Sequence, residues 1–327
     1  MFNAILLTRP EKAVVATLTQ LEEAQLPAGD VLVRVAYSAL NYKDALAVTG
    51  TSLIARSWPM VPGIDLAGTV ERSDNPQWLP GAPVVVTGWG LGETHWGGLA
   101  QKARLNSDWL LPLPAAYSLR DAMIVATAGF TAALAVQALQ RHGLKPGDGE
   151  VLVTGAAGGL GSFALALLAG LGYRAVASTG RPQEAGYLQG LGAARVVDRN
   201  EFVAAGKPLQ NERWAGVVDT VGSHTLANAC AQTRFYGAVA ACGLAQGGDF
   251  PATVMPFILR GVTLYGINSV FCSNTQRREA WDLLAEHVPS SRLAGMAQEI
   301  GLSQVLATAP DVLAGRVRGR TVVDVNR

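Results

Sequence analysis

The segment ALNYKDALAVTG, residues 39–50, places four polar residues among apolar ones, and their types suit proton transfer and hydrogen bonding to a carbonyl oxygen. A Tyr phenol can donate a proton, an Asn amide can donate to an oxyanion, and an Asp carboxylate can orient a neighbour. Asn and Asp also begin helices, and Lys is usually solvated. Asn41, Tyr42, Lys43 and Asp44 alone therefore fit either a reaction site or a helix start.

A glycine-rich turn at residues 151–162, VLVTGAAGGLGS, is typical of a dinucleotide-binding site. It matches a G-x-G-x-x-G register in which Ala156 takes the first position and Gly158 and Gly161 take the others. Small residues let the backbone approach a diphosphate, and the next helix points unpaired N–H groups at that anion. The alternative is a tight turn that only packs a helix on a strand. We expect cofactor contacts from the turn itself, at Ala157, Gly158, Gly159 and Leu160.

The end of the next strand, about 20 residues after these glycines, selects between the two nicotinamide cofactors. NAD sites carry Asp or Glu there, but this chain has Ser178, Thr179, Gly180 and Arg181. Two hydroxyls and a guanidinium suit a 2′-phosphate, and such a charge-assisted contact is worth about 1.5–3 kcal/mol, roughly tenfold to a hundredfold in affinity. Arg199 could also reach this phosphate. NADPH is the predicted cofactor, and the alternative for Arg181 is a solvated residue at a helix start.

Hydrophobic periodicity predicts the elements that position these residues. Residues 28–115 contain short strands bounded by Gly and Pro, which indicates a mostly β domain. Residues 118–144 have a helical period, with Ser118 as a suitable N-cap and Gly143 as a stop. From residue 150, strands alternate with helices, and a last helix and strand complete the chain. This alternation predicts an α/β fold with a doubly wound parallel sheet.

Composition limits the class of protein. The chain has 327 residues, 49% of them apolar and 16% charged, which suits about two domains with a large buried core. A net charge of +1 favours neither nucleic acid nor a membrane surface as a partner. We expect no secretory signal in MFNAILLTRPEK, and the longest apolar stretch, FALALLAGLGY, is too short to span a bilayer. Three cysteines without a C-x-x-C pair fit a reduced, cytoplasmic protein, and we expect ordinary buried residues at Cys230, Cys242 and Cys272.

The order of the two kinds of domain resembles the medium-chain dehydrogenase/reductase superfamily over nearly the whole chain. The resemblance implies a mostly β GroES-like catalytic domain, residues 1–124 and 269–327, and a Rossmann NADPH-binding domain, residues 125–268. Zinc alcohol dehydrogenases of this superfamily carry Gly-His-Glu where this chain has Gly63, Ile64 and Asp65. Ile64 thus replaces the zinc-ligating His, and no run of four closely spaced Cys offers a structural zinc site. We therefore expect a zinc-independent enzyme.

Longer motifs are similar to those of the acrylyl-CoA reductase (NADPH) family, whose members are often labelled putative quinone oxidoreductases. In chain order they are SALNYKDALAVTG, PMVPGIDLAGTV, TGWGLGETHWGGLA, TAGFTAALAV, VDTVG, ACGLAQGG and VMPFILRGVTLYGINSV. The resemblance implies NADPH-dependent reduction of the C=C bond of acrylyl-CoA to propionyl-CoA without a metal. Quinone reduction is the alternative within enzymes, and a non-catalytic NADPH-binding protein is the alternative of another class.

The same resemblance implies that residues 41–44 lie in a cleft between the domains, beside the nicotinamide. Tyr42 is the first catalytic candidate, because its ring can pack by the nicotinamide and its phenol can donate to the developing enolate or to a water. Asn41 would donate its amide to the thioester carbonyl. Asp44 would orient Lys43 or Tyr42, or hold the loop through backbone N–H groups. His95 is a further possible donor, with a packed turn as its alternative.

Residues just past the carboxyl ends of parallel strands line the crevice in which a nucleotide binds. We therefore expect nicotinamide contacts at Gly243, Leu244, Asn268 and Ser269, and by resemblance at Ile258. Thr127 and Thr131 either face the cofactor or only pack a helix.

The expected partners are a small acyl-CoA or quinone substrate and a second copy of the chain. CoA recognition needs cationic side chains, and the candidates, each with a solvated-surface alternative, are Arg56, Arg260 and Arg277. The resemblance and the apolar edge PFILRGVTLYG indicate a homodimer.

Overall fold

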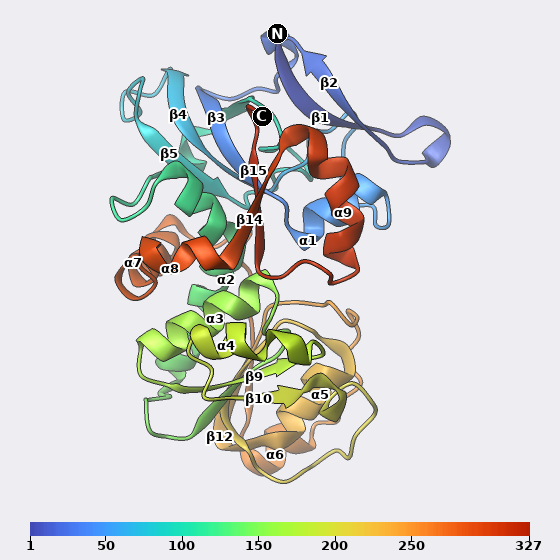
Figure 1. Ribbon diagram of the computed structural model, residues 1–327, viewed down its shortest axis with the longest axis vertical. Helices are drawn as coiled ribbons and strands as arrows, with labels where there is room; N and C mark the ends of the chain where they lie inside the picture. Colours follow the sequence, from blue (N-terminus) through green and yellow to red (C-terminus); the bar gives the residue numbers. More distant parts are fainter. The chain divides into compact units, whose positions relative to one another are not determined.

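The computed structural model describes residues 1–327, which divide into two compact units. Unit 1 consists of Met1–Thr127, Val270–Arg278 and Pro289–Arg327, and unit 2 of Ala128–Ser269 and Glu279–Val288. Two helices, α2 (Leu119–His142) and α7 (Asn274–His287), contribute residues to both units (Figure 1). The predicted catalytic and NADPH-binding roles of the domains stay predictions.

Unit 1 contains the mostly β domain predicted for residues 28–115, and its strands pair mainly antiparallel. Its larger sheet has the order β14-β15-β3-β4-β5-β7, with β6 also paired to β3, and a separate antiparallel hairpin joins β1 to β2. The strands are β1 (Phe2–Thr8), β2 (Val15–Leu21), β3 (Val31–Ala39), β4 (Asp65–Ser73), β5 (Pro83–Thr87), β6 (Lys102–Leu105), β7 (Leu111–Pro112), β14 (Ala297–Gly301) and β15 (Arg320–Asp324). Their core-facing side chains are fully buried and include Val33, Val35, Leu66, Val84 and Val86.

Short helices cover part of this sheet. α1 (Tyr42–Thr49) begins three residues after the end of β3, and α9 (Val305–Leu313) packs against it, as Figure 1 shows. Ala45, Val48, Val305 and Ala309 carry the buried faces of the two helices. α8 (Ser290–Leu293) follows α7. The start of α1 is therefore held between the sheet and a second helix.

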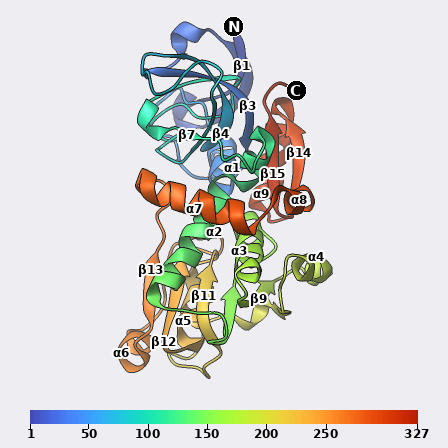
Figure 2. The same ribbon diagram turned by 90° about the vertical axis from the view of Figure 1, so that its left-hand side faces the viewer.

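Unit 2 contains a six-stranded parallel sheet with the order β10-β9-β8-β11-β12-β13. Figure 2 labels β9, β11, β12 and β13 of this sheet. The strands are β8 (Glu150–Val153), β9 (Arg174–Thr179), β10 (Arg195–Asp198), β11 (Trp214–Asp219), β12 (Thr233–Ala241) and β13 (Thr263–Gly266). The helices are α3 (Gly159–Gly170), α4 (Ala185–Gly190), α5 (Ser223–Gln232) and α6 (Met255–Arg260). β11 is buried along its whole length, as expected for a sheet covered on both faces. The predicted doubly wound Rossmann sheet is confirmed, and its order reverses between β8 and β11.

Helix α2 begins and ends as predicted but carries a break that periodicity did not predict. The Ser118 hydroxyl accepts from the backbone N–H of Asp121 at 3.1 Å, and Gly143 follows the helix with φ of 108°. Inside the helix, Ala126 has φ of 41° and ψ of −152°. α2 spans almost the predicted range and has the length and composition of a membrane span, but 89% of its most apolar stretch is buried inside the protein. FALALLAGLGY is therefore not the longest apolar stretch of the chain.

Candidate active site

Tyr42 is the first residue of α1, and its neighbours form the first turn of this helix. Asn41 precedes the helix in an extended conformation, and its backbone N–H donates to the Asp44 carboxylate at 2.9 Å, so Asp44 closes the first turn. Gly50 ends the helix with φ of 68°. Tyr42 is the first helical residue, and its side chain is 40% exposed. The sequence therefore fixes a short helix whose first side chain can meet a ligand.

Asn41 uses every hydrogen-bonding atom of its side chain inside the protein. Its amide nitrogen donates to Asp44 at 3.0 Å and to Asp65 at 2.8 Å, and its oxygen accepts from Arg320 at 3.0 Å. Because both amide hydrogens point at buried carboxylates, neither is left for a thioester carbonyl. The amide-donor role expected for Asn41 therefore has no free hydrogen to support it.

Asp44 is a fully buried carboxylate with a closed set of partners. One oxygen accepts from the Asn41 backbone and side chain, and the other accepts from the backbone N–H groups of Gly63 and Ile64 at 3.1 and 3.0 Å. Burial raises the pKa of Asp44 to about 6, although the hydrogen bonds from Asn41 and Ile64 act in the opposite direction. Of the two roles predicted for Asp44, these contacts match loop-holding through backbone N–H groups.

Lys43 and His95 have partners away from Tyr42. The Lys43 ammonium pairs with Glu93 at 2.7 Å. The two ring nitrogens of His95 lie 3.0 and 3.2 Å from the carbonyl oxygens of Trp96 and Ala28, and the ring stacks edge-on against Trp109. His95 thus matches its alternative interpretation, a residue that packs a turn.

Asp65 and Arg320 complete the buried group around Asn41, and motif reasoning did not assign them a role in the site. Asp65 lies at the start of β4 and accepts from the Thr127 hydroxyl at 2.6 Å and from its backbone N–H at 3.1 Å. Arg320 lies at the start of β15 and donates to the carbonyl of Ile124 at 3.0 Å. Burial raises the pKa of Asp65, and the nearby Arg320 charge partly offsets this effect. The only sequence signal near these residues was the Gly-Ile-Asp at residues 63–65, where zinc alcohol dehydrogenases have Gly-His-Glu.

The glycine-rich turn of unit 2 forms a close backbone cradle after β8. Gly155 has φ of 57°, and a methyl group on Gly161 would lie 2.5 Å from the Gly155 oxygen, so both positions need glycine. Gly158 precedes α3 and has no side chain to cap its first N–H groups, which leaves them directed out of the helix end. Such a cradle at the start of a 12-residue helix fits a diphosphate.

Two arginines approach the end of β9, where the second predicted contact lies. The Arg181 guanidinium donates to the carbonyl of Ala157 in the glycine turn at 2.9 Å, and its backbone N–H donates to the Thr179 hydroxyl at 3.1 Å. The Arg199 side chain lies directly against Gly180, where a methyl group would overlap its guanidinium. Ser178 and Thr179 are buried beneath them. This donor set, without a carboxylate, fits a ribose 2′-phosphate.

The ends of β8, β11 and β12 are tied together at the point where the strand order reverses. Asp219 is buried at the end of β11 and accepts from the Thr154 hydroxyl at 2.7 Å and from the Gly222 N–H at 2.8 Å. A Cβ on Gly155 or on Gly243 would overlap Thr220, so the three loops run in close contact. This arrangement fixes the glycine turn over the sheet edge at which α/β proteins bind nucleotides.

The remaining cofactor candidates lie at the surface or edges of unit 2. Leu244, after β12, and Ile258, in α6, have exposed side chains, and Ser269 is the half-buried last residue of this unit's main segment. Thr131 is buried in α2, and Thr127 bonds Asp65. The exposed Leu244 side chain, just past the carboxyl end of β12, leaves room for a ring system. Ile258 lies in α6, whose Arg260 bonds the carbonyls of Ala231 and Thr233 at the amino end of β12, so the contacts of this helix place it at the opposite edge of the sheet.

Two of the three arginines considered for CoA recognition serve the fold. Arg277 is buried, donates to the Thr87 carbonyl at 2.7 Å and lies over the Trp89 ring. Arg260 donates to backbone carbonyls, among them Ala231 at 2.9 Å. Arg56, in the loop before Trp58, is exposed and is the candidate that stays accessible.

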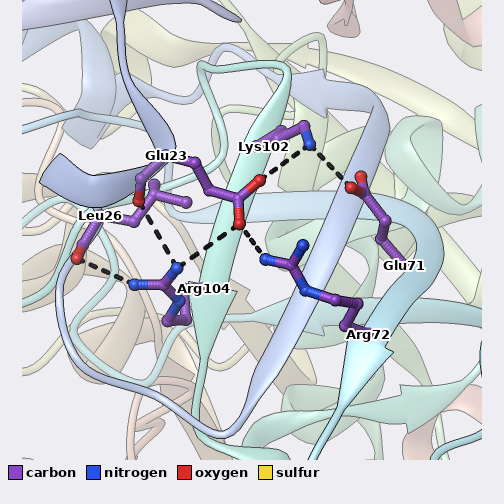
Figure 3. A network of polar contacts seen from close by, with 6 residues as sticks. All are labelled: Glu23, Leu26, Glu71, Arg72, Lys102 and Arg104. Atoms are coloured by element: carbon purple, nitrogen blue, oxygen red, sulfur yellow. Dashed lines mark hydrogen bonds and ion pairs between the residues drawn. The ribbon is translucent and has the colours of Figure 1, made fainter. Parts of the chain in front are cut away.

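In another basic cluster of unit 1, two carboxylates pair with three cations, as Figure 3 shows. The Glu23 carboxylate faces Arg72, Lys102 and Arg104, and Lys102 also pairs with Glu71 at 2.7 Å. The hydrogen bonds from Lys102 and Arg72 lower the pKa of Glu23. A polar cavity of about 390 Å³ lies beside Arg72 and Arg104. Because every cation there has a carboxylate partner, the cluster holds the loop before β3 and leaves no unpaired cation for a phosphate.

The three cysteines are free thiols. Cys230 is buried as expected, whereas Cys242 and Cys272 are only partly covered. Burial raises the pKa of all three thiols, so they are protonated at neutral pH.

Family models match both units of the chain. The Alcohol dehydrogenase GroES-like domain matches residues 27–115, and the Zinc-binding dehydrogenase model matches residues 159–286. The chain is 50% identical to Probable acrylyl-CoA reductase AcuI of Escherichia coli, over 99% of this chain and 100% of that protein. It is also 50% identical to Acrylyl-CoA reductase AcuI of Ruegeria pomeroyi, over the full length of both, and 41% identical to Putative quinone oxidoreductase YhfP of Bacillus subtilis, over 99% and 98%.

Solved structures give the same result. Escherichia coli YhdH with bound NADPH superposes with a TM-score of 0.97 at 50% identity, covering 99% of this chain and 100% of that one. Bacillus subtilis yhfP with NAD bound gives 0.94 at 41% identity, covering 99% of each chain. Fold, motifs and full-length identity agree. The chain belongs to the medium-chain dehydrogenase/reductase family, in the group that contains the acrylyl-CoA reductases and putative quinone oxidoreductases.

Proposed function

We propose that the protein is an NADPH-dependent oxidoreductase that reduces the C=C bond of acrylyl-CoA to propionyl-CoA without a metal. The observation that carries the proposal is the 50% identity, over the full chain, to two proteins named as acrylyl-CoA reductases. The glycine cradle and the carboxylate-free end of β9 support NADPH as the reductant.

Unit 2 provides the cofactor contacts in this proposal. The backbone of Ala157, Gly158, Gly159 and Leu160 holds the diphosphate at the start of α3. Ser178, Thr179, Gly180, Arg181 and Arg199 surround the 2′-phosphate. In the proposal, Leu244 and Ser269 line the nicotinamide, and the Tyr42 ring packs by it. Bound NADPH would supply the hydride that reduces the β-carbon of the substrate.

Tyr42 carries the proton chemistry in this proposal. As the β-carbon is reduced, negative charge develops on the thioester oxygen and the α-carbon must take up a proton. The exposed Tyr42 phenol donates a hydrogen bond to that oxygen, directly or through a water that protonates the α-carbon. Asn41 and Asp44, whose polar atoms are already paired, hold the first turn of α1 so that Tyr42 keeps its direction.

The donor set around Asn41 supports metal-free chemistry. Ile64 offers no ligand atom at the position where zinc alcohol dehydrogenases have His, and the amide of Asn41 is fully hydrogen-bonded to its neighbours. A zinc site needs three or four nitrogen, sulfur or oxygen ligands placed together. The protein should therefore keep its activity after dialysis against a strong chelator.

Quinone reduction is the second candidate, favoured by the 41% identity to YhfP of Bacillus subtilis. The deciding experiment follows NADPH and NADH oxidation with acrylyl-CoA and, separately, with a simple quinone. We expect acrylyl-CoA with NADPH to give by far the highest kcat/KM. Comparable values for the two acceptors would reject a dedicated thioester reductase, and a preference for NADH would reject the role of Arg181. Saturable NADPH binding without oxidation by any activated alkene or quinone would favour a non-catalytic NADPH-binding protein.

The proposal includes a cytoplasmic homodimer. Three free thiols suit a reducing compartment. β13 is an edge strand, and the exposed apolar side chains of Phe235, Tyr236 and Leu259 lie on the neighbouring β12 and α6. An exposed edge with apolar neighbours is the kind of surface that a second copy covers.

A further inference from the structure

The geometry points to Asp65 and Arg320 as positioning residues that lock the start of α1 and thereby aim the Tyr42 phenol. The inference rests on the proposed function, because it assigns a role to the network beneath the proposed proton donor. Neither residue is expected to touch substrate or cofactor, since both side chains are buried.

The first step is the orientation of Asn41. Asp65 accepts from its amide nitrogen at 2.8 Å, and Arg320 donates to its amide oxygen at 3.0 Å. An anion on the nitrogen side and a cation on the oxygen side define one orientation of the amide plane. Asn41 immediately precedes Tyr42, so fixing Asn41 fixes where α1 begins.

The second step is the break in α2. A helix break leaves carbonyls before it and N–H groups after it without helical partners, and each is costly when buried. Before the break, Arg320 donates to the Ile124 carbonyl, and after it, Asp65 accepts from the Thr127 N–H and hydroxyl. The cation thus meets the carboxyl end of one helical segment and the anion meets the amino end of the next. The same two side chains therefore hold both α1 and the broken helix.

The third step is the balance of charge. Two buried carboxylates, Asp44 and Asp65, accept from the Asn41 amide whose oxygen accepts from Arg320, and the Nη2 atom of Arg320 has no hydrogen-bond partner. Arg320 uses Nε for Ile124 and Nη1 for Asn41, a fork that a Lys ammonium cannot reproduce. Arg320→Lys therefore preserves the charge and removes the geometry, whereas Asp65→Asn preserves the shape and removes the charge.

The test compares these two variants with Asp30→Asn and Arg104→Lys, which make the same changes at half-buried positions of unit 1 away from Asn41. We expect Asp65→Asn and Arg320→Lys to lower kcat on the order of 10- to 100-fold, the effect of small misplacement of a reacting group. NADPH affinity, measured by fluorescence titration, should change by less than about threefold, because the diphosphate and 2′-phosphate contacts lie in unit 2 and only the Tyr42 ring is shared with unit 1. The control variants should keep kcat. Equal losses in all four variants, or a large loss of NADPH affinity, would overturn the inference.

A double-mutant cycle with Tyr42 separates positioning from general destabilisation. If Asp65 acts through Tyr42, Asp65→Asn should cost about 10-fold or more in the wild-type background and less than about twofold once Tyr42→Phe is present. Additive losses would contradict the inference, since a merely structural effect would persist without the phenol.

Two readouts distinguish this inference from the proposed function. If the wild-type protein reduces quinones and not acrylyl-CoA, the proposed substrate is wrong, and the same cycle is run with the quinone. If it reduces neither, hydrogen exchange of residues 40–50 decides: faster exchange in Asp65→Asn than in Asp30→Asn supports the lock, and equal exchange rejects it.

Discussion

At the scale of single residues, some polar side chains of the site have all their hydrogen bonds made within the protein, and others are exposed and can bond a ligand. Asn41 and Asp44 are chemically suited to catalysis, yet each of their polar atoms already has a partner. Tyr42, between them in the sequence, is exposed instead. We therefore propose that the Tyr42 phenol does the chemistry of this segment and that Asn41 and Asp44 hold it in place.

Removing the Tyr42 hydroxyl tests this assignment. We expect Tyr42→Phe to lower kcat on the order of 10²-fold, because a positioned general acid typically contributes about 10²–10⁴. Steady-state NADPH oxidation with acrylyl-CoA measures the change. Tyr37→Phe removes a half-buried phenol from β3 of the same unit and should have little effect. Unchanged turnover of Tyr42→Phe would remove Tyr42 from the mechanism.

The two arginines at the end of β9 should determine cofactor preference. We expect Arg181→Ala and Arg199→Ala each to raise KM for NADPH roughly 10- to 100-fold and to leave KM for NADH nearly unchanged, because only NADPH carries the 2′-phosphate. Arg174→Ala, at the opposite end of the same strand, is the control; its side chain pairs with Glu150. A parallel rise for both cofactors would mean that the arginines only stabilise unit 2.

Burial of Asp44 makes a pH-dependent contribution to stability. Its pKa is raised from 3.8 to about 6, so the folded state binds this proton more tightly than the unfolded state. The free energy of unfolding should therefore fall as pH rises from about 4 to 6, by up to about 3 kcal/mol from this group. Urea unfolding of the wild type and Asp44→Asn across this range should show their difference shrinking with rising pH. A constant difference would contradict the raised pKa.

At the scale of elements, the glycine turn illustrates how a backbone and not a side chain builds a binding site. Gly161 lies against the backbone of Gly155 and Ala156, which cannot move aside as a flexible side chain can. The helix that follows is almost entirely buried, so it cannot shift to make room. A side chain added at Gly161 must therefore displace both the backbone of the glycine turn and the start of α3.

Two glycine substitutions in unit 2 should have opposite effects. Gly161→Ala places a methyl group 2.5 Å from the Gly155 oxygen and should cost about 1–3 kcal/mol of stability and raise KM for NADPH at least about 10-fold. Gly186→Ala, in α4, meets open space and should stabilise the protein by about 0.4–1 kcal/mol. Thermal unfolding and NADPH titration measure both. A Gly161→Ala protein that binds NADPH normally would contradict the cradle.

At the scale of the whole molecule, the edge strand β13 and its exposed apolar neighbours are the surface through which we propose that two copies of the chain form a dimer. We expect light scattering after gel filtration to give the mass of a dimer, and Leu259→Glu to give that of a monomer, since a buried charge at an apolar interface is costly. Leu79→Glu alters an exposed Leu of unit 1 and should leave the dimer intact. A monomeric wild type at micromolar concentration would reject the proposed homodimer.

The sequence by itself determined the features that depend on local patterning. Alternation of apolar strands with helices is a periodic signal, so the parallel sheet and its glycine turn were predictable. The missing acid after β9 is likewise a single position at a fixed distance from the glycines. Asn41 and Asp44 were identified as polar residues at a helix start, although spacing could not decide between a cap and a donor.

Only the tertiary structure decided what those residues do, because their partners are distant in the chain. Arg320 reaches Asn41 across 279 positions, and Asp65 reaches Thr127 across 62. Hydrophobic periodicity in a single sequence cannot predict such contacts. It also did not predict the break at Ala126 that they stabilise. Folding buries one guanidinium and two carboxylates around Asn41, and that burial, not residue type, leaves its amide hydrogens already bonded and unavailable to a substrate.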